Sequence, residues 1–426
     1  MLKSANEKLA RLYPGDAIGR QPVHTFIAGG DTFTRDSAQR AGEEATRTLE
    51  TFAPTAKAFA EIVGMPGDVI LAETVSARVY KKLEREPIED FRIDFEDGYG
   101  TRPDAEEDGH AKAAALEVVA AMKSGTLPPF IGIRIKPMSR ELHARSLRTL
   151  DIFVTTVVKA ARRLPDNFAV TLTKVMAPEH VTAVAERCAA LERKLKLTRN
   201  AIRFELMIET PQSIFGPDGR VALLRLVAAG GGRVRGAHFG VYDYTALCGI
   251  TAAWQHPRHL ACDIAREIMR VSLAQTGVMI ADGSSNLLPI PPHVPAAWKR
   301  HFDDVTHSLV NGYYQGWDLH PGHLPTRYAA VYAFYLSALP AATTRLRNFF
   351  TKAEKAGAAF DDAATGQALV NFLNRALSSG AITPEEAAQT GLSESELRTG
   401  SFLKILTGRE KMGDGPLTSR ESRRRS

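Results

Sequence analysis

Two strand-like runs in the middle of the chain are each followed by a carboxylate. The run Ile202 to Ile208 is followed directly by Glu209, and the run Gly236 to Val241 is followed by Asp243. In a sheet of parallel strands the carboxyl ends of neighbouring strands meet at one edge, so these two carboxylates would lie together there. A carboxylate pair without a nearby set of histidines or cysteines suits a hard, oxygen-preferring cation. We therefore predict that Glu209 and Asp243 ligate Mg²⁺, with Mn²⁺ as the alternative.

Other charged residues stand at the ends of further strand-like runs, where barrels of parallel strands carry their active sites. A metal ion at this edge could hold the oxygens of a small oxo acid and stabilise enolate charge. The paired donors of the Arg134 guanidinium could clamp a carboxylate or neutralise an oxyanion. The remaining candidates are Glu96, Asp97 and Lys174 for catalysis, and Asp282 and His320 for substrate binding.

Each of these residues also has a purely structural interpretation. A carboxylate at a strand-to-helix junction is often a helix cap, and Thr210 and Thr245 could share that role with Glu209 and Asp243. Arg134 and Lys174 could simply pair with the acidic residues, and the segment 96–98 could be an ordinary turn. His320 could be a buried histidine of the core. The convergence of all eight charged candidates at one end of one predicted sheet favours a functional site.

Strand-like and helix-like segments alternate eight times between residues 23 and 338. This alternation indicates parallel strands with crossover helices, and eight units favour a closed (β/α)8 TIM barrel of the α/β class. The sequence contains neither the G-x-G-x-x-G nor the G-x-x-x-x-G-K-[ST] motif of nucleotide-binding folds. The predicted strands are Val23–Ala28, Phe91–Phe95, Phe130–Ile135, Ala169–Val175, Ile202–Ile208, Gly236–Val241, Gly277–Ala281 and Gly316–Leu319.

Two segments exceed what a simple barrel needs. Residues 53–89 have helical spacing of apolar residues and form a predicted insertion. Residues 339–426 form a predicted helical extension or lid with a basic tail, and residues 1–338 form the barrel domain. Within the extension, Thr383 and Glu386 have the spacing of a helix-capping pair.

Composition limits the class of protein. The chain has 426 residues, of which 44% are hydrophobic and 24% charged, so it can bury a full core. Three cysteines without a Cys-x-x-Cys spacing indicate neither a disulfide framework nor a thiolate metal site. No apolar stretch has the length of a signal peptide core or a membrane helix, so we expect a soluble, cytoplasmic protein without a membrane partner.

The formal net charge of +6 does not indicate a nucleic-acid partner. The last eight residues, SRESRRRS, supply half of this excess through Arg420, Arg423, Arg424 and Arg425 against one glutamate. No stripe of basic and aromatic residues accompanies this tail. We therefore expect a solvated terminus and no nucleic-acid binding.

Six short motifs occur in an order that resembles the HpcH/HpaI aldolase and citrate lyase beta-subunit family, which is related to malyl-CoA lyase and more distantly to malate synthase. Each motif alone is weak, but their order along residues 23–338 is specific. Lys136-Pro137 departs from the family pattern, which has asparagine after the arginine motif. The motifs are Ile93 to Gly98, Ile133 to Ile135, Thr173 to Val175, Met207 to Pro211, Phe239 to Tyr244 and Leu319 to Pro321.

The resemblance implies a TIM barrel that assembles into trimers or hexamers. It implies that Glu209 and Asp243 ligate the metal, that Arg134 clamps the substrate, and that Lys174 supports the site. Glu96 and Asp97 would lie near metal-bound waters. Asp361 or Asp362 would be the general acid or base, because relatives carry an aspartate in a similar carboxyl-terminal region.

The expected function is that of an Mg²⁺-dependent carbon-carbon lyase or aldolase. Its substrate would be a hydroxy acid or a hydroxyacyl-CoA thioester, with release or condensation of a small α-keto acid such as glyoxylate, pyruvate or oxaloacetate. A first alternative is a malate-synthase-like condensing enzyme that also hydrolyses the thioester. A second alternative, from another class, is a barrel that binds a ligand without turnover.

Overall fold

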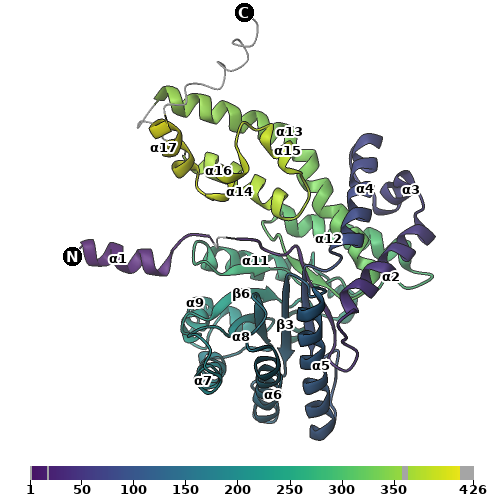
Figure 1. The fold of residues 1–426 in the computed structure, drawn as a ribbon, viewed down its shortest axis with the longest axis vertical. Coiled ribbons are helices and arrows are strands. Elements are labelled where there is room, and N and C mark those ends of the chain that lie inside the picture. The colour runs from purple at the N-terminus through teal and green to yellow at the C-terminus, as the bar shows by residue number, and fades with distance from the viewer. Residues whose placement is uncertain (1, 17–18, 357–362, 413–426) are drawn as a thin grey trace, which may run out of the picture.

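Eight parallel strands form a nearly closed barrel surrounded by helices (Figure 1). This computed structural model describes residues 2–16, 19–356 and 363–412. Hydrogen bonds join the strands in the order β7-β6-β5-β4-β3-β2-β1-β8, so the predicted TIM-barrel fold is confirmed. The strands are β1 (His24–Gly29), β2 (Asp90–Asp94), β3 (Phe130–Ile135), β4 (Phe168–Leu172), β5 (Arg203–Ile208), β6 (Val234–Phe239), β7 (Met279–Ala281) and β8 (Gly316–Asp318).

The seam between β7 and β8 is closed by contacts that follow β7. The Asp282 N–H donates to the carbonyl of Gln315 at 2.8 Å, and an isolated bridge joins Ser284 to Trp317. Closure leaves few free strand edges for association with other chains.

Helices follow the strands at nearly the predicted positions. The structure corrects two strand ends that concern the candidate site. The strand β4 stops at Leu172, so Lys174 lies in the loop after it, and β6 stops at Phe239, so Val241 begins a short helix, α10. Asp243 therefore lies in the first turn of α10 rather than at a strand end. The helices around the barrel are α2 (Ser37–Phe52), α5 (Asp104–Ser124), α6 (His143–Ala161), α7 (Pro178–Leu195), α8 (Pro211–Ile214), α9 (Leu223–Ala229), α10 (Val241–Leu247), α11 (Leu260–Leu273) and α12 (Val294–Val310), with 3₁₀ turns η1 (Ala252–Trp254) and η2 (Pro321–His323).

The barrel interior carries charged side chains at its centre. Arg92 of β2 is fully buried and donates to Asp90 at 2.8 Å and to Glu205 of β5 at 2.7 Å. Gly132 of β3 makes room for this arginine, since a Cβ there would lie 2.5 Å from its Nη1 and 1.9 Å from the Ala169 carbonyl oxygen. Buried charges are tolerated where they are paired in this way.

The segment 53–89 forms two helices, α3 (Ala56–Val63) and α4 (Val69–Arg85), at one side of the barrel (Figure 1). Helix α3 packs against α12, and α4 packs against α13 (Leu324–Ala356). The start of α3 is capped by Thr55 and that of α4 by Asp68. Helix α13 is continuous across residue 338, where the sequence predicted a domain boundary.

The carboxyl-terminal extension contacts the amino-terminal end of the barrel. Arg375 stacks 4.2 Å from the ring centre of Tyr314, which precedes β8, and Arg78 in the middle of α4 bonds to Glu386 at 2.6 Å. These contacts lie opposite the carboxyl ends of the strands, so they form no lid over this chain's own site. The extension consists of α14 (Ala363–Ser378), α15 (Pro384–Ala388), α16 (Glu394–Arg398) and α17 (Phe402–Met412), and the capping box predicted at Thr383 is present.

None of the helices described in the structure combines the length and the apolar character needed to cross a membrane. The arginines of the basic tail lie outside the described residues.

Candidate active site at the carboxyl end of the barrel

Lys174, just after β4, gathers the acidic candidates around its side chain. Its Nζ lies 2.5 Å from Glu96 Oε1 and 2.9 Å from Asp97 Oδ2, in the loop after β2. The same atom lies 3.4 Å from Asp243 Oδ2 on α10. The structure therefore brings together residues that are separated by up to 147 positions in the sequence (243 minus 96).

The backbone of Lys174 places Glu209 in the same group. Lys174 has φ of 47°, in the left-handed region that a non-glycine residue adopts at some cost. In this conformation its N–H donates to Glu209 Oε1 at 2.6 Å. Left-handed backbone of this kind is concentrated at functional sites.

Gly240 leaves room for the Glu209 side chain. A Cβ at this position would lie 2.4 Å from Glu209 Cβ and 2.6 Å from its Oε2. No side chain fits at that distance, so a glycine is required between β6 and α10. The predicted alternative role of Thr210 as a helix cap is also present, because its hydroxyl accepts from the Ser213 N–H.

Arg134 is held rigidly beside this group. Its Nε and Nη2 both donate to Asp94, each at 2.7 Å, and its Nη1 lies 3.3 Å from Glu96 Oε2. The guanidinium also lies over the ring of Trp317, 5.9 Å from its centre. Paired hydrogen bonds of this type fix both the position and the plane of the arginine.

Asp94 is a site residue that the sequence interpretation missed. Besides Arg134, its carboxylate accepts from the N–H groups of Glu96 at 3.0 Å and Gly98 at 2.8 Å, and so shapes the acidic loop. The alternation of side chains along β2 could have identified it, because Asp94 faces the same side of the sheet as its register partner Arg134.

Lys136 also supports the acidic loop. Its Nζ donates to the Phe95 carbonyl at 2.6 Å and pairs with Glu107 of α5 at 2.8 Å. The side chain is buried, so this lysine ties the loop after β2 to the helix that follows it. Lys136, which stands where the family motif has asparagine, thus makes structural contacts.

The pKa values of the group reflect burial and mutual repulsion. Burial is the largest cause that raises the pKa of Glu209 to about 8, and repulsion from Asp243 and Glu96 adds to it against the attraction of Lys174. Burial likewise raises the pKa of Glu96, although Arg134 and Lys174 oppose this. For Lys174, burial favours the neutral amine, but Glu96 and Glu209 outweigh it and the pKa is raised, so the side chain stays an ammonium ion.

The donor set of this group fits a hard divalent cation. Four carboxylates, Glu96, Asp97, Glu209 and Asp243, gather around Lys174, and together with Asp94 they outnumber the two cations Lys174 and Arg134. A buried carboxylate whose pKa is raised gains stability from a nearby positive charge. All the donors are oxygens, which is the chemistry that Mg²⁺ and Mn²⁺ prefer.

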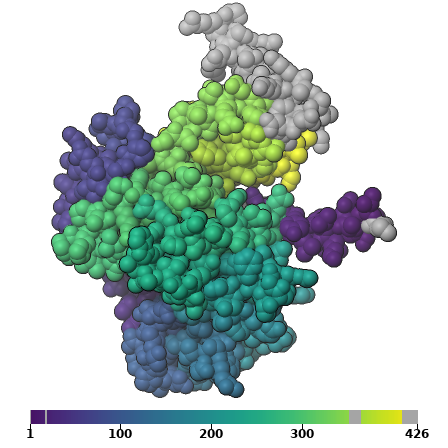
Figure 2. Space-filling view, turned by 180° about the vertical axis from the view of Figure 1, so that it is seen from behind, coloured from purple at the N-terminus to yellow at the C-terminus, as the bar shows by residue number. Residues whose placement is uncertain are grey.

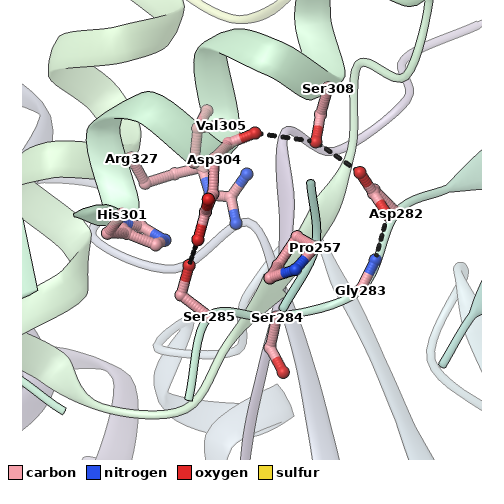
Figure 3. A pocket seen from close by; sticks show the side chains of 10 residues that line it. All are labelled: Pro257, Asp282, Gly283, Ser284, Ser285, His301, Asp304, Val305, Ser308 and Arg327. Carbon is pink, nitrogen blue, oxygen red and sulfur yellow. Dashed lines mark hydrogen bonds between the residues drawn. The ribbon is translucent and has the colours of Figure 1, made fainter. Parts of the chain in front are cut away.

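Asp282 does not join this group. Its carboxylate accepts from Arg266 of α11 at 2.9 Å and from the Ser308 hydroxyl of α12 (Figure 3). The reason is strand alternation, since Ala281 pairs in register with the inward-facing His238 and the next residue must point outward. The small cavity in Figure 3 is lined by the segment after β7, by α12 and by Arg327 of α13, and Glu209 is not among its lining residues.

His320 lies beside α2. Its Nδ1 accepts from the Gly322 N–H at 3.0 Å, and its Nε2 lies 3.6 Å from Glu44. None of the contacts described for His320 is with the group around Lys174. The other two candidates, Asp361 and Asp362, lie outside the described residues.

A second group of metal-type ligands is buried outside the barrel wall, where His301, Asp318 and His323 lie within 4.8 Å of one another. Asp318 is already engaged, because Arg327 donates to it at 2.9 Å, His301 Nε2 lies 3.0 Å away and His24 Nδ1 also 3.0 Å away. These contacts give the group a structural role in joining β1 and β8 to α12 and α13.

The sequence model of one protein family matches residues 2–405, and that family is described as a domain of unknown function, DUF6986. The chain belongs to this family. No curated protein shows a significant match to the sequence.

Solved structures similar to this chain are barrels of low sequence identity. One is a malate synthase from Haloferax volcanii at 3 mM glyoxylate, with 13% identity, 91% of this chain and 99% of that chain covered, and a TM-score of 0.45. Another is an HpcH/HpaI aldolase/citrate lyase family protein from Burkholderia cenocepacia J2315, with 12% identity, 80% and 99% covered, and a TM-score of 0.41. A third is CitE from Mycobacterium tuberculosis in complex with magnesium and acetate, with 13% identity, 72% and 90% covered, and a TM-score of 0.41.

Proposed function

We propose that this protein is an Mg²⁺-dependent lyase or aldolase that makes or breaks a carbon-carbon bond next to the carbonyl of a small oxo acid. The observation that carries the proposal is the group around Lys174, whose backbone N–H donates to Glu209 and whose Nζ lies 3.4 Å from Asp243, beside the fixed Arg134. The ordered motifs of the sequence support the same reaction class.

Glu209 and Asp243 would hold the metal, with Glu96 and Asp97 near its waters. The bound metal would supply Lewis-acid stabilisation of enolate charge on the oxo acid. Arg134 presents a positive charge whose plane is fixed by Asp94, which suits it to hold the carboxylate of the substrate.

The two other charged residues have distinct roles in this proposal. Glu96 is buried and its pKa is raised, which suits it to hold a proton close to the reacting carbon. Lys174 acts as a fixed positive charge, because its raised pKa keeps the amine protonated and unsuited to forming a Schiff base.

The test is a retro-aldol screen of hydroxy-oxo acids and hydroxyacyl-CoA thioesters, with and without EDTA. We expect release of an α-keto acid that EDTA abolishes and Mg²⁺ restores, and a loss of at least roughly 100-fold in kcat for Glu209→Gln. Glu117→Gln on the surface of α5 is the matched control and should keep full activity. Turnover that survives both EDTA and Glu209→Gln contradicts the metal site.

Two further readouts separate the alternatives. Borohydride treatment in the presence of keto acid should leave Lys174 unlabelled, because no Schiff base forms. Release of free CoA thiol would instead favour the condensing and thioester-hydrolysing enzyme. Binding of oxo acids without any turnover across the screen would favour a non-catalytic barrel.

A further inference from the structure

Helix α1 (Leu2–Leu12) stands away from the rest of the chain. All of its residues are exposed, and both views show it projecting from the body as a separate purple rod (Figures 1 and 2). Leu2, Leu9 and Leu12 lie on one face of the helix, and the exposed fraction of Leu2 is 79%. A helix with an apolar face that packs against nothing in its own chain gains stability only by docking elsewhere.

A second apolar stripe faces solvent on α11. Leu260, Ile264 and Val271 are exposed, with exposed fractions of 69%, 51% and 69%, and the half-buried Ile268 continues them at helical spacing. These four positions lie within about 80° around the helix axis, given 100° per residue. The stripe is therefore a continuous ridge on the outer surface of the barrel.

The two apolar faces match in length and in charge. Helix α1 has 11 residues and spans roughly 16 Å, which is also the distance along α11 from Leu260 to Val271. Lys3, Lys8 and Arg11 outnumber Glu7 on α1, whereas Asp263 and Glu267 border the stripe on α11. Those two acids pair within the chain with Arg266 and Arg270, and each is at least one-third exposed.

The attachment point of α1 lies beside α11. The Gly15 N–H donates to the carbonyl of Gln275 at 3.0 Å, immediately after α11 ends. From there α1 leads outward, away from the body of its own chain (Figure 1). In a twofold pair of chains, each copy would present its α1 to the α11 of the other, so the contact would form twice.

We propose that α1 of one chain packs along the α11 stripe of a second copy, and that this exchange forms a dimer. The interface consists of Leu2, Leu9, Leu12 and Tyr13 of one copy against Leu260, Ile264, Ile268 and Val271 of the other. It does not depend on the proposed catalytic activity.

Analytical ultracentrifugation of the full-length chain tests the interface. Wild type should sediment as a dimer or a multiple of it at micromolar concentration. Leu9→Glu and Ile264→Glu should each raise the dissociation constant at least roughly 100-fold, because a charge enters the apolar contact. Both positions are exposed within one chain, so the variants should keep the thermal stability of the monomer. Leu116→Glu, at an exposed leucine of α5, is the matched control and should leave the assembly unchanged.

Cross-linking shows whether the contact is between chains. In a Cys248→Ser background, which removes the exposed native thiol, one tagged chain carries Leu9→Cys and an untagged chain carries Ile264→Cys. A short bis-maleimide should join the two different chains. A monomeric wild type, an assembly unchanged by Ile264→Glu, or cross-linking seen only when both cysteines are in the same chain would overturn the proposal.

Discussion

At the scale of single residues, Gly240 decides whether Glu209 can lie in the site. Any Cβ at position 240 would lie 2.6 Å from Glu209 Oε2, well inside normal contact distance. The carboxylate and the glycine come from adjacent strands, so a methyl group on one strand would displace the ligand on the other.

We expect Gly240→Ala to weaken Mg²⁺ binding by roughly 10- to 100-fold, a range typical for a change that misplaces a metal ligand. Isothermal titration with Mg²⁺ measures this without any substrate. Gly109→Ala is the control, since a Cβ there meets nothing within 4 Å and lies inside helix α5. It should leave Mg²⁺ binding unchanged and stabilise the fold by about 0.5–1 kcal/mol. Equal Mg²⁺ affinity in Gly240→Ala and wild type would contradict the assignment of Glu209 as a ligand.

Lys174 has one role in its backbone and another in its side chain. Asparagine tolerates the left-handed conformation better than most residues, so Lys174→Asn should keep the hydrogen bond to Glu209 while removing the ammonium ion. We expect turnover to fall by roughly 100-fold because a fixed positive charge is lost. Mg²⁺ affinity should stay equal or become tighter, because the carboxylates lose their competing cation. Steady-state kinetics combined with Mg²⁺ titration separates these effects, and a parallel loss of both would show that Lys174 only maintains the fold of the site.

At the scale of elements, the loop after β2 depends on the lysine that follows β3. Lys136 bonds to the Phe95 carbonyl and to the buried Glu107, so its removal leaves a carboxylate without its cation. We expect Lys136→Met to lower the free energy of unfolding by about 3 kcal/mol, the cost of breaking a buried ion pair. Urea denaturation measures the change, and Lys112→Met at an exposed position of α5 provides the comparison. A difference below about 0.5 kcal/mol between the two variants would mean that the loop is held by other contacts.

Short elements also explain which of the predicted site residues the structure brings together and which it does not. Glu209 follows β5 directly and Lys174 lies two residues after the end of β4, so finding the strands was enough to place both at one edge. Asp282 follows β7 just as directly, but it points outward to Arg266 because its neighbour Ala281 faces inward. Strand ends can be predicted from composition, whereas the side that each terminal residue faces depends on the register with the next strand.

At the scale of the whole molecule, a buried histidine group joins the barrel to α12 and α13. Burial, with a smaller contribution from the neighbouring His301, lowers the pKa of His323 to about 3. In the unfolded chain a histidine has a pKa of about 6.5, so below that pH the unfolded state binds a proton that the folded state does not. The free energy of unfolding is therefore not reduced by His323 protonation above pH 6.5, and it decreases as the pH falls from 6.5 toward 3.

We expect the free energy of unfolding to fall by roughly 2 kcal/mol between pH 6.5 and 5 through His323 alone, at 1.36 kcal/mol per pH unit. Urea midpoints measured across this range test the expectation. His323→Gln should be less stable than wild type at pH 7.5 but should show a shallower loss toward pH 5. An identical slope in the variant would assign the acid sensitivity to other groups.

The sequence by itself determined the barrel and most of the acidic group at its mouth. The period of apolar residues and the turn residues between segments are local properties, so eight strands and their order could be predicted, and the residues that end parallel strands necessarily share one face. Only the tertiary structure decided that Lys174 is the centre of the group, that Asp94 fixes Arg134, and that the extension contacts the opposite end of the barrel from the candidate site. These features depend on register, on side-chain direction and on contacts between residues far apart in the chain, which no local pattern encodes.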